Sequence, residues 1–502
     1  MADYDAIIIG AGCGGLSVGA QLAKQGRRTL VLEQSERVGG CCSTFERNGF
    51  HFDLGASIIE SADLIDLAFK RLGTTLWNEV DLVHCDPTYT VMLQDGSKVK
   101  FPLSIDETAR EIGRVAPEDV PNWYRFVRYM QDFKSALGDF FTSPAITLGD
   151  MANVFIESPR LLRFAPLFAS SYQDVMLKFF RNPRTREALS YQTLFIGLPP
   201  ELCLGLFAII PYAEHDGIYY SRGGMIGIPA ALRRCGERLG LEVQLNTRVR
   251  RVLVRDGRAV GVRLMDGTEI TADVVVSDIN AKTLYLDLIG EEHLPWLARV
   301  GIKSYEYAMA VPMLYLGVDY APPLASHHTL VTLPMEKVND FWWNIYKQNR
   351  YPNDQFGIIS WTSGSDPNLA PDGHHVIILT LAPAPYQLHG TTWDAAKPAL
   401  LESIVCDFDQ YIPGLSEHVK VAELATPLDF ERRLLVPQGT IYALRQDLTS
   451  EMAFRPSAKS KSVKGLYLVG ASTHPGGGVP TTIASGLIAA DLIEKYEQGR
   501  LA

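Results

Sequence analysis

Residues 5–16, DAIIIGAGCGGL, set the architecture expected of this chain. Residues 6–9 are apolar and mostly β-branched, which predicts a buried strand. Residues 16–25 predict a helix that stops at Gly26. A strand that enters a helix through a glycine-rich turn is typical of the first unit of an α/β nucleotide-binding fold.

The glycines of this turn have separate steric roles. Gly10 permits the tight turn, Gly12 lets the backbone approach a pyrophosphate, and Gly15 lets the helix pack closely on the strand. The helix N-terminus then faces phosphate charge. We therefore predict that this turn, including Cys13 and Gly14, binds a dinucleotide.

A carboxylate follows at the place where such a fold needs one. The second predicted strand, residues 29–32, ends at Glu33, which can accept hydrogen bonds from an adenosine ribose. A glycine turn without a ligand is the alternative, and the combination of strand, helix and Glu33 favours the dinucleotide. The fingerprint alone does not choose between NAD and FAD.

Composition narrows the class of protein. The 502 residues are 47% hydrophobic and 21% charged, with a net charge of −10, which predicts a folded multidomain protein and argues against a nucleic-acid partner.

The seven cysteines, and histidines without metal-ligand spacing, predict reduced thiols in a cytoplasm and no metal site. The N-terminus lacks the basic region of a signal peptide. Residues 189–212 are apolar but contain Pro199 and Pro200, so we expect core rather than a membrane span.

Several later segments match one family. They are Glu33-Gln34-Ser35-Glu36-Arg37-Val38-Gly39-Gly40, residues 52–57 (FDLGAS), 217–232, 246–249 (NTRV), 366–375 and 466–480 (LYLVGASTHPGGGVP). Together they resemble the FAD-binding amine oxidase and carotenoid desaturase or polyene isomerase flavoproteins. The resemblance runs from Tyr4 to about Tyr496 and is loose between Leu67 and Glu214.

The resemblance implies an α/β fold with FAD as the cofactor. Residues 1–75, 215–290 and 455–502 are expected to form a discontinuous Rossmann-like FAD-binding domain, and residues 76–214 and 291–454 an interleaved α+β substrate domain. By the same resemblance, further FAD-binding residues are Gln34, Arg37, Gly39, Gly40, Cys41, Gly55, Ala56, Ser57, Val249, Gly470, Ala471, Gly478, Val479, Pro480 and Thr481.

Two departures leave the subfamily open. Cys41 stands where many desaturases carry arginine, and Ala56-Ser57 replaces a proline–threonine pair, as in the polyene isomerases and saturases. Residues 473–476 (THPG) are in contrast more similar to the desaturases.

The first functional hypothesis is dehydrogenation of a long apolar polyene by hydride transfer to flavin N5, as in phytoene desaturase, with oxygen or a quinone as the final acceptor. The alternatives are a redox-neutral cis–trans isomerase or a saturase using reduced FAD, an amine oxidase acting on an apolar substrate, and a non-enzymatic lipid-binding protein similar to Rab GDP dissociation inhibitors. A polyene substrate implies peripheral attachment to a membrane surface. Residues 161–180, if helical, are one candidate for it, and a core helix is the favoured alternative for this segment. The oligomeric state is open.

Candidates for acid–base chemistry are few. His474 is the best single one, although a histidine in such a turn can equally serve as a hydrogen-bond anchor. Residues 214–216 (EHD) are expected to be a solvated turn, and Trp342-Trp343 to belong to the core. No charged cluster for a polar substrate is evident along the sequence.

Overall fold

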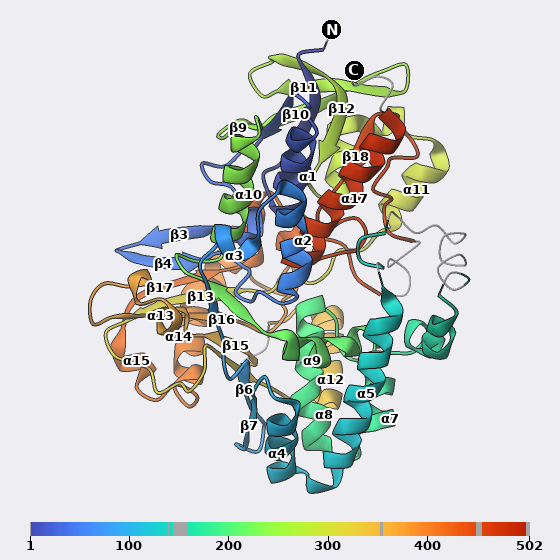
Figure 1. Cartoon of the computed structure of the whole chain (residues 1–502). Helices are drawn as coiled ribbons and strands as arrows, with labels where there is room; N and C mark the ends of the chain where they lie inside the picture. Colours follow the sequence, from blue (N-terminus) through green and yellow to red (C-terminus); the bar gives the residue numbers. More distant parts are fainter. Residues whose placement is uncertain are drawn as a thin grey trace.

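Two seven-stranded sheets organise the chain (Figure 1). The computed structural model describes residues 2–138, 140–143, 156, 158–351, 355–447 and 454–497. The first sheet has the order β10-β11-β12-β1-β2-β9, with β18 beside β12. Its strands are β1 (Tyr4–Ile9), β2 (Thr29–Leu32), β9 (Glu242–Gln244), β10 (Val249–Arg255), β11 (Arg258–Leu264), β12 (Glu269–Ser277) and β18 (Leu466–Leu468).

The centre of the first sheet is parallel. β1 pairs in parallel with β2 and β12, and β18 pairs in parallel with β12, so the carboxyl ends of these strands share one edge. All seven strands come from the segments expected to build the FAD-binding domain. In the upper half of Figure 1, α1 (Cys13–Lys24) packs against α10 (Gly227–Arg238) and α17 (Val479–Glu497), and α17 packs against α2 (Ala62–Leu72).

The second sheet has the order β17-β13-β16-β15-β14-β6-β7. Phe408 of α14 (Trp393–Phe408) packs with Leu316 and Leu379 on one face of this sheet. On the opposite face, the Tyr315 hydroxyl donates to the Leu54 carbonyl at 2.6 Å, which ties the sheet to the segment before Gly55. The strands are β6 (Tyr89–Met92), β7 (Lys98–Phe101), β13 (Met313–Val318), β14 (His328–Val331), β15 (Gly357–Ser360), β16 (His375–Thr380) and β17 (Val419–Ala425).

A helical region lies beside the second sheet, at the lower right of Figure 1. It contains α4 (Ile105–Val115), α5 (Val120–Leu137), α7 (Tyr172–Phe179), α8 (Pro183–Ser190), α9 (Ile210–Ala213) and α12 (Met335–Gln348). Trp342 of α12 is fully buried, as expected, whereas the expectation of a core position is wrong for Trp343, which is 40% exposed. The other elements that concern the site are β3 (Thr44–Arg47), β4 (Phe50–Asp53), β5 (Leu82–His84), β8 (Tyr219–Ser221), α16 (Pro427–Leu434) and the 3₁₀ segments Pro159–Phe168, Tyr191–Ile196 and Glu214–Asp216.

Residues 161–180 are not one interfacial helix. The 3₁₀ segment Pro159–Phe168 contains Pro166 and is separate from α7, and Phe164, Phe179 and Phe180 are buried. These three buried side chains support the alternative of a core segment over an interfacial apolar face. Within the described ranges, none of the helices combines the length and the apolar character needed to cross a bilayer.

Candidate active site

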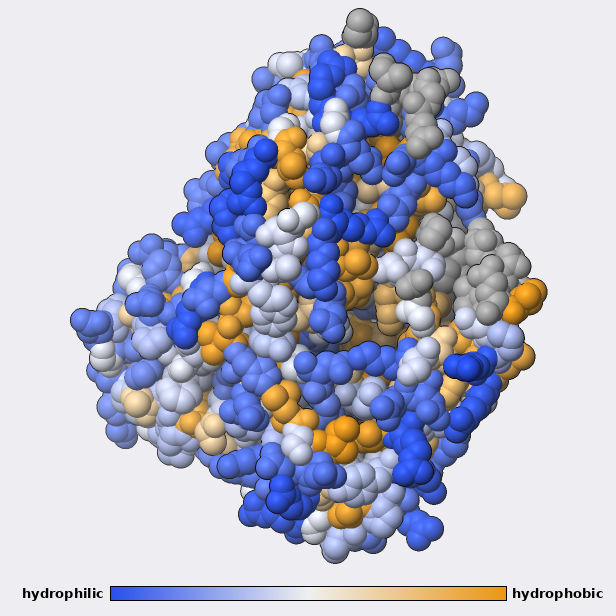
Figure 2. All heavy atoms as spheres, viewed as in Figure 1, coloured by the Kyte–Doolittle hydropathy of each residue, from blue (hydrophilic) through white to orange (hydrophobic). Residues whose placement is uncertain are grey.

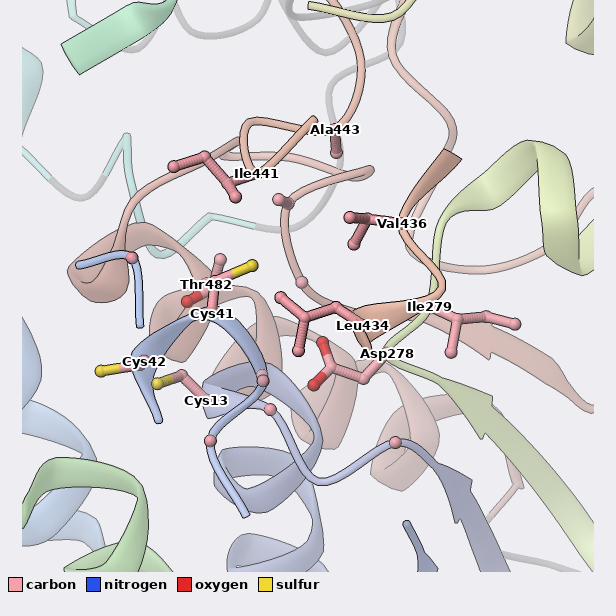
Figure 3. Close-up of a pocket in the computed structure, with 18 of the residues that line it drawn as sticks. Cys13, Cys41, Cys42, Asp278, Ile279, Leu434, Val436, Ile441, Ala443 and Thr482 are labelled. Atoms are coloured by element: carbon pink, nitrogen blue, oxygen red, sulfur yellow. The ribbon is translucent and has the colours of Figure 1, made fainter. Parts of the chain in front are cut away.

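A cavity of about 450 Å³ opens at the carboxyl edge of the first sheet (Figure 3). Its walls come from segments far apart in the sequence: the turn between β1 and α1, residues 39–42, residues 55–60, residues 278–280, the loop 434–443 and residues 470–482. Figure 3 shows Ile441, Val436 and Ala443 across the cavity from the turn that carries Cys13. The loop 434–443 was not predicted, since its sequence carries neither a motif nor a helical or strand period.

The first glycine turn lies in the cavity wall as expected. Gly10, Gly12, Cys13 and Gly14 line the cavity. Gly15 lies behind the wall, where an added Cβ would come within 2.1 Å of the Gly10 carbonyl oxygen. Absence of a side chain at Gly15 therefore lets α1 pack on the end of β1, the role predicted for it.

Glu33 is held rigidly at the end of β2. Its Oε2 accepts a hydrogen bond from the Ala11 backbone N–H at 2.8 Å, and its Oε1 accepts one from the Ser35 N–H at 2.8 Å. The side chain is buried at the cavity wall, next to Gln34 and Val249, which also line it. The predicted ribose-binding carboxylate is thus fixed by the turn that it accompanies.

Asp278 is a cavity residue that the sequence did not reveal. It follows β12, and its carboxyl lies over the glycine turn, so that a Cβ added to Gly12 would come within 2.4 Å of Asp278 Oδ2. Burial raises the pKa of Asp278 to about 7, and backbone hydrogen bonds from Gly15 and Gly12 oppose that rise. The charge of this carboxyl therefore changes near neutral pH, at the place predicted for a pyrophosphate.

The second glycine pair closes against the first turn. The Gly39 N–H donates to the Ala11 carbonyl at 2.8 Å, and Gly39 and Gly40 have φ of 109° and 55°, values that favour glycine. Gly39, Gly40 and Cys41 line the cavity, and burial raises the pKa of the Cys41 thiol to about 12, so the thiol stays neutral. Arg37 lies outside the lining, and its guanidinium donates to the Thr44 carbonyl at 3.3 Å.

Two aspartates, Asp53 and Asp366, hold the turn at residues 221–225 by hydrogen bonds next to the segment 55–57. Asp53 accepts hydrogen bonds from the Tyr220 hydroxyl at 2.6 Å and the Met225 N–H at 2.7 Å, and burial raises its pKa to about 6. Asp366 accepts one from the Gly223 N–H at 2.7 Å. The turn 221–225 is thus fixed from both sides, and Gly55, Ala56 and Ser57 follow Asp53 into the cavity wall.

The C-terminal motif supplies another wall. Gly470, Ala471, Gly478, Val479 and Pro480 line the cavity, and α17 begins there at Val479, so the positive end of its dipole lies at the site. Thr481 lies outside the lining, and its hydroxyl donates to the Gly477 and Gly478 carbonyl oxygens at 2.7 and 3.0 Å. Its role is to close the first turn of α17.

His474 does not line the cavity. Its Nε2 lies 3.2 Å from the Phe140 carbonyl oxygen, its ring contacts the Phe140 ring edge-on, and burial lowers its pKa to about 4. A neutral, buried imidazole that hydrogen-bonds a carbonyl supports the anchoring role over the acid–base role.

The expectation of a solvated turn at residues 214–216 is wrong for Glu214. This side chain is 3% exposed, and its Oε2 accepts hydrogen bonds from the Tyr89 hydroxyl at 2.5 Å and from Gln192 Nε2 at 3.2 Å. Charged residues in a row predicted a solvent-exposed turn. The partners that bury Glu214 are Tyr89 and Gln192, which lie 125 and 22 positions away in the sequence. A polar cluster therefore does form in space.

The cavity fits FAD. Turns without side chains at Gly10, Gly12 and Gly40 leave backbone facing a cavity that continues to Gly55 and Gly478, so an elongated dinucleotide has a cradle that added side chains would fill. The residues that would hold it are the first glycine turn with Glu33, the segments 39–41 and 55–57, and residues 470–480 of the C-terminal motif that line the cavity.

Comparisons with known proteins agree with this geometry. The family model for flavin containing amine oxidoreductases matches residues 13–494. A neurosporene-forming phytoene desaturase from Rhodobacter capsulatus is 31% identical, with 97% of this chain and 93% of that protein covered. A lycopene-forming phytoene desaturase from a Paracoccus species is 29% identical over 97% of both chains.

Solved structures show the same fold at low sequence identity. A putrescine oxidase has a TM-score of 0.65 at 16% identity, covering 98% of this chain and 99% of that one. An oxidoreductase from Methanosarcina mazei has a TM-score of 0.66 at 17% identity, covering 97% of this chain and 99% of that one. The chain therefore belongs to the flavin containing amine oxidoreductase family and is an FAD-dependent oxidoreductase.

Proposed function

We propose that this protein dehydrogenates a long apolar polyene of the carotenoid-precursor class. One observation carries the proposal: the cavity that contains the dinucleotide turns also has an apolar wall made of Ile58, Phe195, Leu434, Val436 and Ile441. A hydrocarbon chain gains free energy from such a wall, whereas a polar substrate would lose its hydration there. The names of the similar desaturases agree with this substrate class.

Each part of the cavity has a distinct role in this proposal. The turn at Gly10–Gly15 and Glu33 would hold the nucleotide end of FAD, and residues 55–57 with residues 478–480 would hold its flavin end. When bound, FAD supplies a ring that takes up hydride from the substrate. The N-terminus of α17 would favour negative charge developing beside it, and the apolar wall would exclude water and orient the chain of the substrate.

We also propose that the protein binds a membrane surface peripherally, where such a substrate is found. A surface depression is lined by Arg125, Arg128, Tyr129, Asp132, Arg163, Lys178 and Phe179, here called the basic face. The Arg163 guanidinium pairs with Asp132 at 3.1 Å, while Lys178 lies 5.3 Å from the centre of the Tyr129 ring. Leu162 and Leu177, adjacent in sequence to two of these cations, are 61% and 49% exposed. Cations beside exposed leucines suit an anionic lipid surface.

Expression in cells that accumulate phytoene tests the substrate directly. The proposal expects coloured products with more conjugated double bonds in the extracted pigments, and a Gly12→Val variant that loses FAD should leave phytoene unchanged. Geometric isomers without new double bonds would instead support the isomerase, which Ala56 and Ser57 in the cavity wall leave as the second candidate. Unaltered phytoene with the FAD-loaded protein present would overturn the proposal.

A further inference from the structure

Glu60 is a carboxylate in the wall of the cavity. It lines the cavity together with Ile58 and Phe195, two residues of the apolar wall. Its backbone is fixed, because Ile59 and Tyr219 exchange two N–H to carbonyl hydrogen bonds of 3.0 Å and α2 begins at Ala62. A carboxylate in an apolar wall is costly to charge, so its presence there needs an explanation.

Behind Glu60 lies the buried polar group of Glu214, Tyr89 and Gln192. Besides the two hydrogen bonds to Glu214 Oε2, Gln192 Nε2 donates to the Tyr89 hydroxyl oxygen at 2.9 Å. Glu214 Oε1 and Gln192 Oε1 are buried without a hydrogen-bond partner among the residues that the structure describes. The group therefore retains unsatisfied hydrogen-bonding capacity next to the cavity, which is unusual for a merely structural network.

The two carboxyls cannot both be ionised cheaply. Burial raises the pKa of Glu60 to about 7, and burial together with the charge of Glu60 raises the pKa of Glu214 well above its usual range. Tyr89 on β6 and Tyr172 on α7, which face Glu214, have pKa values raised by burial and stay neutral. The pair therefore carries a single charge when its first carboxyl ionises, and Glu60 is the member of the pair that lines the cavity.

The other ionisable residues of the cavity wall are less suited to accept a proton from the substrate, because of their position or their protonation state. Glu33 and Asp278, the other carboxylates among the described lining residues, lie at the nucleotide end beside Ala11 and Gly12. None of the described lining residues is a histidine. Burial raises the pKa of Tyr442 beyond the range of a base at neutral pH.

We propose that Glu60 is the general base of the dehydrogenation, an assignment that rests on the proposed function. One carbon of the substrate gives its hydrogen and both bonding electrons to the oxidised flavin as hydride. The neighbouring carbon gives its hydrogen as a proton to the Glu60 carboxylate, and the electron pair of that C–H bond becomes the new double bond. Glu214 is a positioning residue that keeps its own proton and leaves the single charge on Glu60.

The test compares Glu60→Gln, Glu60→Asp and the wild type, all loaded with FAD and mixed anaerobically with phytoene in vesicles. Asp63→Asn is the matched control, because Asp63 is exposed, lies three positions later and does not line the cavity. Flavin reduction in the wild type should rise with pH through about 7 as Glu60 ionises. Glu60→Gln should reduce flavin on the order of 100-fold more slowly and without that rise, whereas Glu60→Asp should keep the rise at a lower rate.

A second readout does not depend on turnover. Infrared titration of the FAD-loaded protein without substrate should show carboxyls that lose their protons near pH 7, because Asp278 and Glu60 both titrate there. Glu60→Gln should lose the contribution of one carboxyl to this signal, and the control should lose none. Equal rates and pH profiles in wild type and Glu60→Gln would overturn the base and leave the proposed function intact. A pH-dependent limb lost in Glu214→Gln but kept in Glu60→Gln would assign the base to Glu214 instead. No flavin reduction in the wild type would overturn the function itself.

Discussion

At the residue scale, the charge of Asp278 should control FAD binding. Its carboxyl lies over the turn predicted to hold the pyrophosphate, and its pKa is raised to about 7 from 3.8. As pH rises through 7, the group loses its proton and the resulting carboxylate repels the anionic pyrophosphate. The affinity for FAD should therefore fall as pH increases across this interval.

Asp278→Asn removes this charge. We expect the wild-type dissociation constant for FAD to increase roughly tenfold between about pH 6 and about pH 8, and the variant to keep a constant one. The measurement is quenching of flavin fluorescence on binding, with Asp266→Asn in an exposed hairpin turn as the control. For the cofactor-free protein, a raised pKa means stability that declines as pH rises from about 4 to about 7, so the variant should melt higher at alkaline pH. An FAD dissociation constant of Asp278→Asn that still increases between these pH values would contradict this account.

Residues with local signals were predictable and those assembled from distant segments were not. The glycine turn and Glu33 lie within one βαβ unit, so their spacing is visible in the sequence. Glu60 and Glu214 are separated by 154 positions, counted as 214 minus 60, and only the packing of β6 and the 3₁₀ segments brings Glu214 to Tyr89 and Gln192. A polar residue such as Glu214 is therefore predicted to be solvent-exposed from the sequence, although the fold buries it beside hydrogen-bond partners.

At the element scale, two glycines of the turn between β1 and α1 have different roles: Gly15 is needed for folding and Gly12 for cofactor binding. An added Cβ at Gly15 would meet the Gly10 carbonyl oxygen at 2.1 Å, which is rigid backbone. An added Cβ at Gly12 would meet Asp278 Oδ2 at 2.4 Å, the end of a side chain that can move aside. The same substitution should thus have different consequences at the two positions.

Gly15→Ala should lower the stability of the cofactor-free protein by about 2 kcal/mol, because α1 must shift from β1. Gly12→Ala should change that stability by less than about 1 kcal/mol and weaken FAD binding at least about tenfold, because its Cβ occupies the approach to the pyrophosphate. Thermal unfolding and FAD titration of both variants check this. Equal loss of stability in the two variants would contradict the distinction.

Asp53 provides a second test at this scale, since it holds β8 and the turn after it against β4. Asp53→Ala leaves the Tyr220 hydroxyl and the Met225 N–H without their acceptor and should cost about 3 kcal/mol. Tyr220→Phe removes only one partner and should cost about 1 kcal/mol. The double variant should lose less than the sum of the two, and strict additivity in thermal unfolding would show that the contact carries no energy.

Element boundaries followed the strength of the periodic signal. The helix expected from Leu16 begins at Cys13, because the glycines of the first turn carry no apolar period although they adopt helical geometry. Helix α12 (Met335–Gln348) lies within the segment expected to belong to the α+β substrate domain, and its Trp342 and Ile345 are buried against the core.

At the scale of the whole molecule, the active-site cavity depends on both sheets. β1 and β12 present the nucleotide turns, while Thr380 of β16 and Ile358 of β15 line the cavity from the other sheet. On the face shown in Figure 2, hydrophobic residues lie inside a hollow between the upper and lower parts of the molecule. Segments from both parts of the molecule can build one site because the chain passes between them several times, and each passage contributes residues to the cavity wall.

The basic face gives a prediction at the same scale. The double variant Arg128→Glu and Lys178→Glu should reduce flotation with anionic vesicles at least about tenfold, since each cation contributes about 1 kcal/mol at such a surface. Arg250→Glu with Lys98→Glu, both exposed and outside the basic face, is the matched control. Unchanged flotation of the first variant would show that membrane binding, if present, uses another surface.

The central claim is that this FAD-dependent oxidoreductase oxidises an apolar polyene, and anaerobic reduction of its bound flavin tests it most directly. The FAD-loaded protein is mixed without oxygen with vesicles containing phytoene, and in parallel with putrescine as a small amine, while the flavin absorbance is recorded. The account predicts that phytoene bleaches the oxidised flavin, with a product that has gained one conjugated double bond per flavin reduced. Bleaching by the amine with no response to phytoene would contradict it.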